Sequence, residues 1–358
     1  MNLKNVIILA LVAVLFSACT EEQNPFMLPA VEGAIVDAEV GGPLQPNQVY
    51  LDLSVEASKV VPRNSYDLGF FTGDDFHVVL NNSTSALALA LDKNDLNEVD
   101  PSDTVGLGRQ LDVDAIFSSL FGPPIPWIND AKNWIDHPSG DLDRTAIAEV
   151  SATDDDNKVY ILNQGNNPDG SNRGWKKVRV LRNGNGYTLQ YANIADANFQ
   201  TLTIEKNTDL RFVQVNLDAG VVEATPATDR WDLAFTTFTT LLPVDAATRI
   251  PYAFKDYVIT NSSEVRVATV NGADVTYEEF GNSHLADLTF TRDISAIGSS
   301  WRTVAAPNSG NSTGVVADIY YVLEDADTNL YKIRFTRMLN PQTGERGYPQ
   351  MQYNLITE

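Results

Sequence analysis

Histidine and methionine are the side chains whose chemistry stands out in this sequence, because imidazole nitrogen and thioether sulfur are good ligands for transition metals. Both are scarce: the chain holds three histidines and four methionines. His137 lies within residues 134–140, and the Pro-Ser-Gly that follows it predicts a loop from which a side chain can face a ligand. We therefore take His137 as the first candidate ligand.

The remaining histidines and methionines sit in predicted strands and turns. His77 lies in residues 76–80, where alternation turns it away from its apolar neighbours. His284 ends a polar turn at residues 281–284. Met338 and Met351 belong to the predicted closing hairpin, where Met351 is expected in the core and Met338 could reach a loop. His77 and Met338 are therefore the further candidates.

No catalytic motif with the required spacing is present. The sequence has no HExxH pair, no Gly-rich phosphate loop and no Gly-x-Ser-x-Gly elbow, and its one cysteine is Cys19. Residues 153–157, Thr-Asp-Asp-Asp-Asn, could hold Ca²⁺, but they lack the ligand spacing of an EF-hand and predict an acidic turn. We expect a binding protein, not an enzyme.

The first residues predict export. Lys4 precedes an apolar run at residues 6–16 that ends in Ser17-Ala18-Cys19. This run is shorter than the roughly 20 residues of a membrane-spanning helix, and it predicts a signal peptide at residues 1–18. Small residues before Cys19 resemble the lipobox of bacterial lipoproteins, so Cys19 is expected to carry lipid. Residues 19–26 then form a polar, acidic tether.

The composition bounds the partners and the domain count. A net charge of -22 makes contact with nucleic acid repulsive, because such contacts need Lys and Arg to neutralise phosphates. With 43% hydrophobic residues in 358, the chain can build a core, and its length allows two domains.

An internal repeat supports two domains. Residues 65–70 read Ser-Tyr-Asp-Leu-Gly-Phe, and residues 230–235 read Arg-Trp-Asp-Leu-Ala-Phe. Further pairs follow in the same order, including Lys-Val-Arg-Val from Lys177 and Lys-Ile-Arg-Phe from Lys332. We therefore predict tandem domains at residues 27–205 and 206–358.

Strands dominate the predicted elements. Residues 49–53 and 212–217 alternate apolar and polar side chains, as strands with one buried face do. One stretch, residues 112–121, has helical spacing with Asp112 at the cap position, and a second short helix is expected at 128–135. The prediction is an all-β antiparallel fold with a small helical insertion in the first domain.

The second copy resembles the HmuY family, the haem-binding surface lipoproteins of Bacteroidetes. The matching strings run in order from residues 212–213 through 220–222, 231–235, 275–279, Trp301, 318–322 and 330–335 to the closing 347–353. The first copy shares the resemblance through its likeness to the second. These strings are mostly aromatic and aliphatic, so they describe core and strand register.

The resemblance implies a role. It implies an outer-membrane lipoprotein displayed at the cell surface through lipid on Cys19, which captures haem or a haemoprotein's haem and hands it to a TonB-dependent receptor. The family's iron ligands are histidines before the Tyr-Glu-Glu string and shortly after the tryptophan. Residues 271–275 and 302–306 hold no such ligand in the second copy, whereas His137 follows Trp134 in the first.

Two functions stay open at this point. One is a haem- or porphyrin-binding accessory with His137, His77 or Met338 as iron ligand. The other is a surface module of the same fold that binds a protein partner or a glycan without haem.

Overall fold

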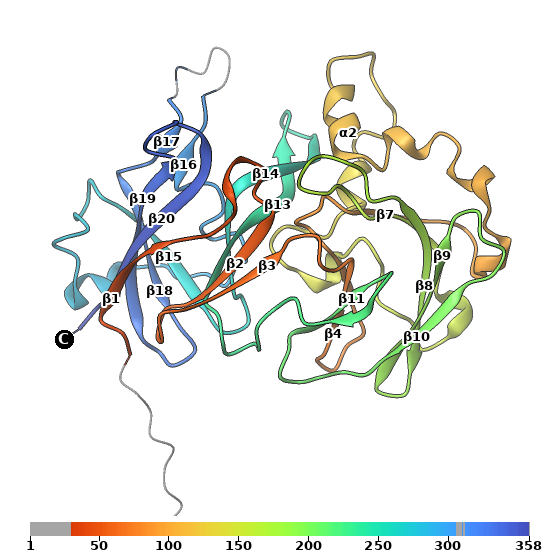
Figure 1. Ribbon diagram of the computed structural model, residues 1–358, viewed down its shortest axis with the longest axis horizontal. Helices are drawn as coiled ribbons and strands as arrows, with labels where there is room; N and C mark the ends of the chain where they lie inside the picture. The colour runs from red at the N-terminus through yellow and green to blue at the C-terminus, as the bar shows by residue number, and fades with distance from the viewer. Residues whose placement is uncertain (1–29, 306–309, 311, 358) are drawn as a thin grey trace, which may run out of the picture. The chain divides into compact units, whose positions relative to one another are not determined.

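Antiparallel strand pairs make up most of the regular structure in residues 30–305, 310 and 312–357, which the computed structural model describes (Figure 1). Within this part of the chain the strands form four main sheets and one two-stranded ribbon. The predicted all-β class is confirmed. The signal peptide at 1–18, Cys19 and the tether at 19–26 lie outside the described residues, and the compact unit begins at Val31.

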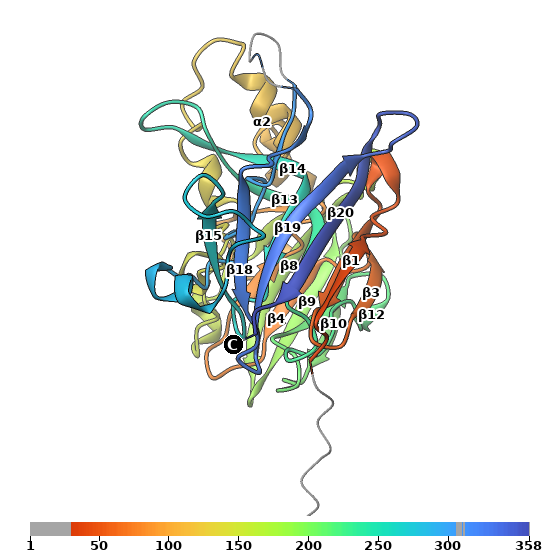
Figure 2. The same cartoon turned by 90° about the vertical axis from the view of Figure 1, so that its left-hand side faces the viewer.

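Two five-stranded sheets each contain a run of successive hairpins. The first has the order β1 (Gly33–Asp37), β20 (Arg346–Leu355), β19 (Leu330–Leu339), β18 (Ile319–Glu324) and β15 (Arg266–Asn271). The second has the order β10 (Gln200–Ile204), β9 (Gly186–Asn193), β8 (Trp175–Asn183), β7 (Tyr160–Asn163) and β6 (Leu87–Ala90). Figure 2 shows the strands of the first sheet side by side, with β1 next to β20.

Two four-stranded sheets complete the frame. One has the order β14 (Arg249–Thr260), β13 (Leu233–Pro243), β2 (Asn47–Asp52) and β3 (Ala57–Pro62). The other has the order β12 (Gly220–Val222), β11 (Phe212–Asn216), β4 (Leu68–Phe71) and β5 (Val78–Leu80). The ribbon joins β16 (Arg302–Thr303) and β17 (Gly314–Val315). Strands β2 and β11 match the two strands expected at 49–53 and 212–217.

Alternating side chains explain why these segments pair as they do. Along β20 every second residue is buried, from Gly347 to Tyr353, while the residues between them stay partly exposed. β19 shows the same alternation as far as Phe335, and Ile333 lies opposite Tyr353 in the register. Because side chains of a strand point alternately to the two faces, this pattern places one face of the hairpin in the core.

Aromatic rings fill the core under the first sheet. Trp301 is 1% exposed and stacks on Phe335 with ring centroids 4.5 Å apart. Met338 and Met351 belong to the same core cluster. A separate cluster under the second sheet centres on Phe70 and Tyr187, whose rings meet edge to face. Aromatic pairs of this kind add to the free energy gained from burial alone.

The helical insertion is present but smaller than predicted. The helix α2 (Val113–Ser119) begins after Asp112, whose carboxylate accepts a hydrogen bond from Ala115 N at 2.7 Å. The helix expected at 128–135 is only a 3-10 turn at Ala131–Asn133, so that expectation was wrong in extent. Other 3-10 turns are Gly42–Leu44, Leu96–Glu98, Pro101–Thr104, Leu107–Arg109, Leu142–Arg144, Asp154–Asp156 and Asn282–Asp287.

Tyr66 and Trp231, the anchors of the sequence repeat, occupy matching places. Each precedes a strand by two residues, β4 for Tyr66 and β13 for Trp231. The carbonyl of Tyr66 accepts from Asn81 Nδ2 at 2.8 Å, and that of Trp231 accepts from Asn261 Nδ2 at 2.9 Å. The two repeated strings therefore fold into the same local arrangement.

The sheets, however, take strands from both sides of the predicted boundary between residues 205 and 206. β1 pairs with β20 and β2 pairs with β13, whereas β11 pairs with β4. The hairpin of β2 and β3 thus completes a sheet with the second repeat, and the hairpin of β11 and β12 completes a sheet with the first. The division into 27–205 and 206–358 stays a prediction about sequence copies, and the sheets do not follow it.

Candidate functional site

A pocket of about 140 Å³ lies where the two four-stranded sheets and the loop around His137 meet. Its walls come from β2, β4, β11, β13 and β14 and from residues 136–145. These segments are far apart in the sequence and meet only because β2 joins β13 and β11 joins β4. The exchange of hairpins therefore builds the pocket.

Aromatic rings line much of this pocket. Tyr50, Tyr66, Phe212, Trp231 and Phe238 all contribute to its walls. Tyr50 and Trp231 meet edge to face with ring centroids 5.2 Å apart. The hydroxyl of Tyr50 donates to Gln48 Oε1 at 2.7 Å, which fixes the ring and its neighbouring amide. The arrangement offers flat apolar surface beside polar groups, as small-molecule sites do.

Three amide side chains of the lining have carbonyl oxygens that are buried and accept no hydrogen bond from the described residues. They are Asn82 Oδ1, Gln214 Oε1 and Asn261 Oδ1. Gln214 and Asn261 are only 3% and 1% exposed. A buried acceptor without a donor costs about 1–3 kcal/mol, so such groups call for a partner.

The loop carrying His137 is fixed by the carboxylate of Asp136. Asp136 is buried and accepts hydrogen bonds from Leu80 N at 2.6 Å and from Ala146 N at 3.0 Å. Burial raises the pKa of Asp136 to about 7, although these two N–H groups favour the charged form. The Asp136 carboxylate thus holds the loop against β5, and both of its oxygens accept hydrogen bonds from backbone N–H groups.

His137 itself lines the pocket, as its loop position suggested. Its Nδ1 lies 2.8 Å from Ser139 Oγ, and its backbone N–H donates to the carbonyl of Arg144. Burial, with the nearby Arg144, lowers the pKa of His137 below its usual value. A neutral imidazole with one occupied nitrogen can offer its Nε2 to a ligand or a metal.

The other candidates lie elsewhere. His77 is 4% exposed, stands beside Phe71 and lies outside the pocket lining, with its Nδ1 unpartnered among the described residues. Met338 is 1% exposed in the core cluster of Trp301. His284 packs on Phe280 in its turn. The structure therefore brings only His137, of the sequence candidates, into the pocket.

The acidic turn expected at 153–157 forms a 3-10 turn at Asp154–Asp156 that buries no side chain. In residues 30–305, 310 and 312–357 no group of three or more His, Cys, Asp or Glu side chains is placed to hold a metal ion. Nor does any helix in that part of the chain have the length and apolar character needed to cross a membrane.

Sequence reasoning missed Gln214 and Asn261. Gln214 sits within an ordinary alternating strand, and Asn261 is the equivalent of Asn81 in the repeat. Spacing gives no signal for them, because Asn81 lies 15 residues after Tyr66 whereas Asn261 lies 30 residues after Trp231. No neighbouring residue in the sequence indicates that the side-chain carbonyl of Asn261 lacks the hydrogen-bond donors that the carbonyl of Asn81 has.

Fold and pocket together define an all-β protein with an aromatic-walled pocket. Residues 44–353 match the family model described as HmuY protein, and the chain belongs to the HmuY family. This is a family of binding proteins associated with haem, and its members are surface lipoproteins.

The crystal structure of apo PinO from Porphyromonas gingivitis is similar at 14% identity, covering 45% of this chain and 86% of that chain, with a TM-score of 0.20. A comparison with curated proteins gave no match.

Proposed function

We propose that this protein is a surface lipoprotein that captures a small amphipathic ligand in the pocket between its two four-stranded sheets, without catalysing a reaction. The observation that carries the proposal is the pocket itself: five aromatic rings and three buried, donor-less carbonyl oxygens meet there from distant segments. Unsatisfied buried acceptors destabilise a protein, and a bound ligand with hydrogen-bond donors removes that cost.

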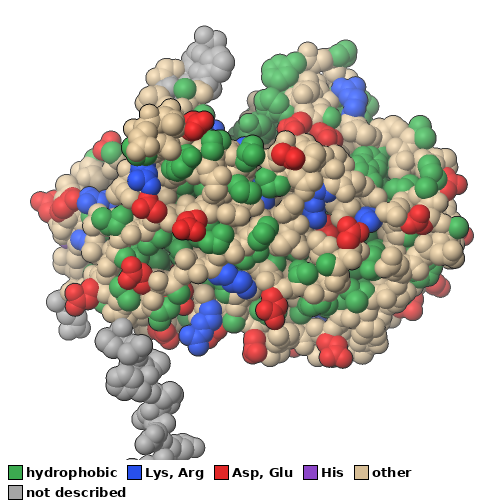
Figure 3. All heavy atoms as spheres, in the orientation of Figure 1, with side chains coloured by type: hydrophobic (Ala, Val, Ile, Leu, Met, Phe, Trp, Pro, Cys, Tyr) green, Lys and Arg blue, Asp and Glu red, His purple; other side chains and the backbone are tan. Residues whose placement is uncertain are grey.

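Attachment and display are part of the proposal. Lipid on Cys19 would hold the chain at the outer membrane, and the tether at 19–26 would let the folded unit face outward. The chain has a net charge of -22, and Asp and Glu side chains are scattered over the face shown in Figure 3. This negative charge repels nucleic acid and disfavours it as a partner. A TonB-dependent receptor in the same membrane would accept the cargo.

Haem is the second candidate, and His137 is the observation that favours it. The family is associated with haem, and this histidine lines the pocket with its Nδ1 already held by Ser139. Two features favour a smaller ligand. His77 and Met338 lie outside the pocket lining, and a volume of 140 Å³ is below the roughly 300–1,000 Å³ of sites for drug-sized molecules.

A haemin titration of the full chain separates the two candidates. We expect no Soret shift that saturates at one equivalent, because one histidine and a small cavity do not secure the porphyrin. His284→Ala, in a turn outside the pocket lining, is the matched control for His137→Ala. A stoichiometric shift that survives in His284→Ala and disappears in His137→Ala would overturn the small-ligand proposal in favour of haem.

A fragment screen by ligand-observed NMR tests the pocket directly. We expect neutral or aromatic fragments to bind competitively at one site, and Trp231→Ala to abolish that binding. If fragments of every chemical class leave the wild-type protein unchanged, the pocket has no binding role and the proposal fails.

A further inference from the structure

Asn81 and Asn261 are the same position of the repeated arrangement, and they differ in what their carbonyl oxygens accept. Asn81 Oδ1 accepts hydrogen bonds from Ser83 N at 3.0 Å and from Ser83 Oγ at 2.6 Å. Asn261 Nδ2 donates to Thr228 O at 2.6 Å and to Trp231 O at 2.9 Å, which fixes the orientation of its amide. Its Oδ1 then accepts nothing from the described residues.

The serine that could serve Asn261 is held away from it. Ser263, two residues after Asn261 as Ser83 is after Asn81, has its hydroxyl bonded to the guanidinium of Arg211. Asn261 and Arg211 both line the pocket. The first repeat therefore satisfies this carbonyl within the protein, and the second leaves it buried beside the pocket without a donor.

Gln214 and Asn82 add two more acceptors. Gln214 Nε2 donates to Thr225 Oγ1 at 2.7 Å, so its Oε1 is the end left without a donor. Asn82 Oδ1 is likewise buried and unpartnered among the described residues. A lining of carbonyl oxygens selects a ligand that carries several O–H or N–H donors.

We propose that the pocket binds a single neutral sugar ring, with the hydroxyls donating to Asn261, Gln214 and Asn82 and a face of the ring against Trp231. This inference rests on the proposed function and names its ligand class. Aromatic faces are electron-rich and attract the C–H groups that a sugar ring presents on its faces. Hydroxyls around the same ring supply the donors that the three carbonyls lack.

Charge and size exclude the other donor-rich ligands. A cationic amine would meet the guanidinium of Arg211 in the lining. Both carboxylates of the lining are already bonded, Asp136 to two backbone N–H groups and Asp141 to Arg144. An anion would face three carbonyl oxygens. A volume of 140 Å³ holds about ten waters at roughly 10–15 Å³ each, which is the size of one ring and not of a long chain.

The test uses the full chain in a detergent without sugar headgroups and saturation-transfer NMR with methyl glycosides of glucose, galactose and mannose and with N-acetylglucosamine. At about 10 mM these probes report dissociation constants in the millimolar range. We expect at least one to bind. Gln214→Met removes the acceptor at similar size, and it should weaken binding about tenfold or more.

Gln342→Met is the matched control, because Gln342 lies in an exposed turn outside the pocket lining and should leave binding unchanged. Trp231→Phe should retain binding that Trp231→Leu loses, which separates a stacking role from a folding defect. Sugar binding that is equal in Gln214→Met and wild type overturns the assigned site. If no sugar binds while aromatic or cationic fragments do, the sugar inference fails and the proposed function stands; if nothing binds, both fail.

Discussion

Asp67 and Asp232 hold the same place in the two repeats and do the same work for the backbone. The N–H of Asp67 donates to Val215 O at 2.8 Å, and its Oδ2 accepts from Leu217 N at 2.8 Å. The N–H of Asp232 donates to Leu51 O at 2.7 Å, and its Oδ2 accepts from Leu53 N at 2.7 Å. Asp67 thus clamps the hairpin of β11 and β12 to β4, and Asp232 clamps the hairpin of β2 and β3 to β13.

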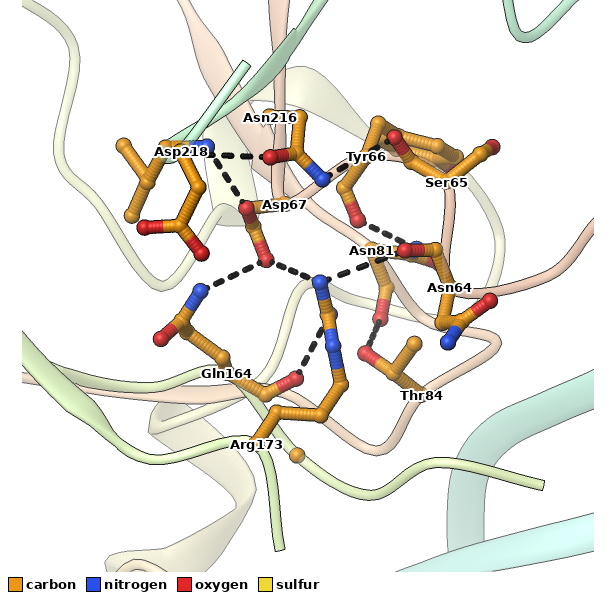
Figure 4. Close-up of polar contacts among 12 residues, drawn as sticks. Asn64, Ser65, Tyr66, Asp67, Asn81, Thr84, Gln164, Arg173, Asn216 and Asp218 are labelled. Carbon is orange, nitrogen blue, oxygen red and sulfur yellow. Dashed lines mark hydrogen bonds and ion pairs between the residues drawn. The ribbon is translucent and has the colours of Figure 1, made fainter.

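Their surroundings differ sharply in charge. Asp67 is 1% exposed, and its Oδ1 lies 2.8 Å from Arg173 Nη2 and accepts from Gln164 Nε2 at 3.0 Å (Figure 4). Asp325 stands where Gln164 would be, because Gln164 directly follows β7 and Asp325 directly follows β18, the fourth strand of each five-stranded sheet. Each also closes a turn by a backbone bond, Gln164 with Gly174 and Asp325 with Asn329. In the second repeat, therefore, the neighbour of the buried Asp232 carboxylate is another carboxylate, that of Asp325.

The consequence is a carboxylate that titrates near neutral pH. Burial, together with the charges of Asp52, Asp325 and Asp327, raises the pKa of Asp232 to about 7, although the hydrogen bond from Leu53 N favours the charged form. The comparison shows that the two repeats share the backbone contacts of the aspartate, whereas the charged groups around its carboxylate differ. One repeat neutralises its buried aspartate, and the other leaves it dependent on pH.

Arg173→Met is the strongest way to break this comparison. It leaves Asp67 buried without its cation and also removes donors to Gln164 O and Asn64 O. Losing one partner of a buried ion pair typically costs about 3–5 kcal/mol, so we expect a decrease of that size in the free energy of unfolding in urea. Arg230→Met, in an exposed pair with Asp229, should change it by less than about 1 kcal/mol. Equal effects of the two substitutions would show that buried Asp67 does not depend on Arg173 to balance its charge.

Asp232→Asn sharpens the comparison from the other side. The folded-state pKa of Asp232 lies above the unfolded value, so its stabilising effect is complete below about pH 4 and is lost as pH rises through 7. Asparagine can still accept from Leu53 N and has no charge to bury. We expect Asp232→Asn to be more stable than wild type by about 2 kcal/mol at pH 8 and not at pH 4.

Urea unfolding at a series of pH values measures this difference. Asp136, whose pKa is also about 7, is present in both proteins, so subtracting the two curves isolates Asp232. Asp67→Asn is the control in the first repeat, and it should destabilise the protein at both pH values because it removes the partner of Arg173. A flat difference curve would contradict the assignment of the titration to Asp232.

The sequence predicted the repeated local structures well and their assembly poorly. The strings before β4 and β13 and the alternation of β2 and β11 were readable because they depend on neighbouring residues. The pairing of β2 with β13 and of β11 with β4 is not visible in any local pattern, because it joins segments that lie far apart in the sequence. Because the sequence does not show this pairing, the predicted boundary between residues 205 and 206 does not match the sheets.

The candidate site was predictable to the same extent. His137 was found because its loop signal is local, and the structure places it in the pocket. Gln214 and Asn261 were missed, because their role depends on carbonyl oxygens left without donors after assembly. Met338 is buried although the alternation that buries Phe335 would turn it outward, because the register of β19 shifts between Phe335 and Leu339.

The helical insertion marks a second contrast, because the described part of the second repeat has no counterpart of α2. Asp112 caps this helix through Ala115 N, and replacing such a cap by alanine costs about 1 kcal/mol. If the insertion unfolds together with the sheets, Asp112→Ala lowers the melting temperature of the whole protein by a few degrees.

Hydrogen exchange decides whether that cost is shared. Ile116 is fully buried and packs in one core cluster with Ile161 of β7 and Ile250 of β14, so we expect loss of the cap to increase exchange in α2 and in those strands alike. An increase confined to residues 113–119 would mean that the insertion opens by itself. In that case the first repeat would be the same sheet unit as the second with an independent element added, and the contrast between the repeats would reduce to the charges around Asp67 and Asp232.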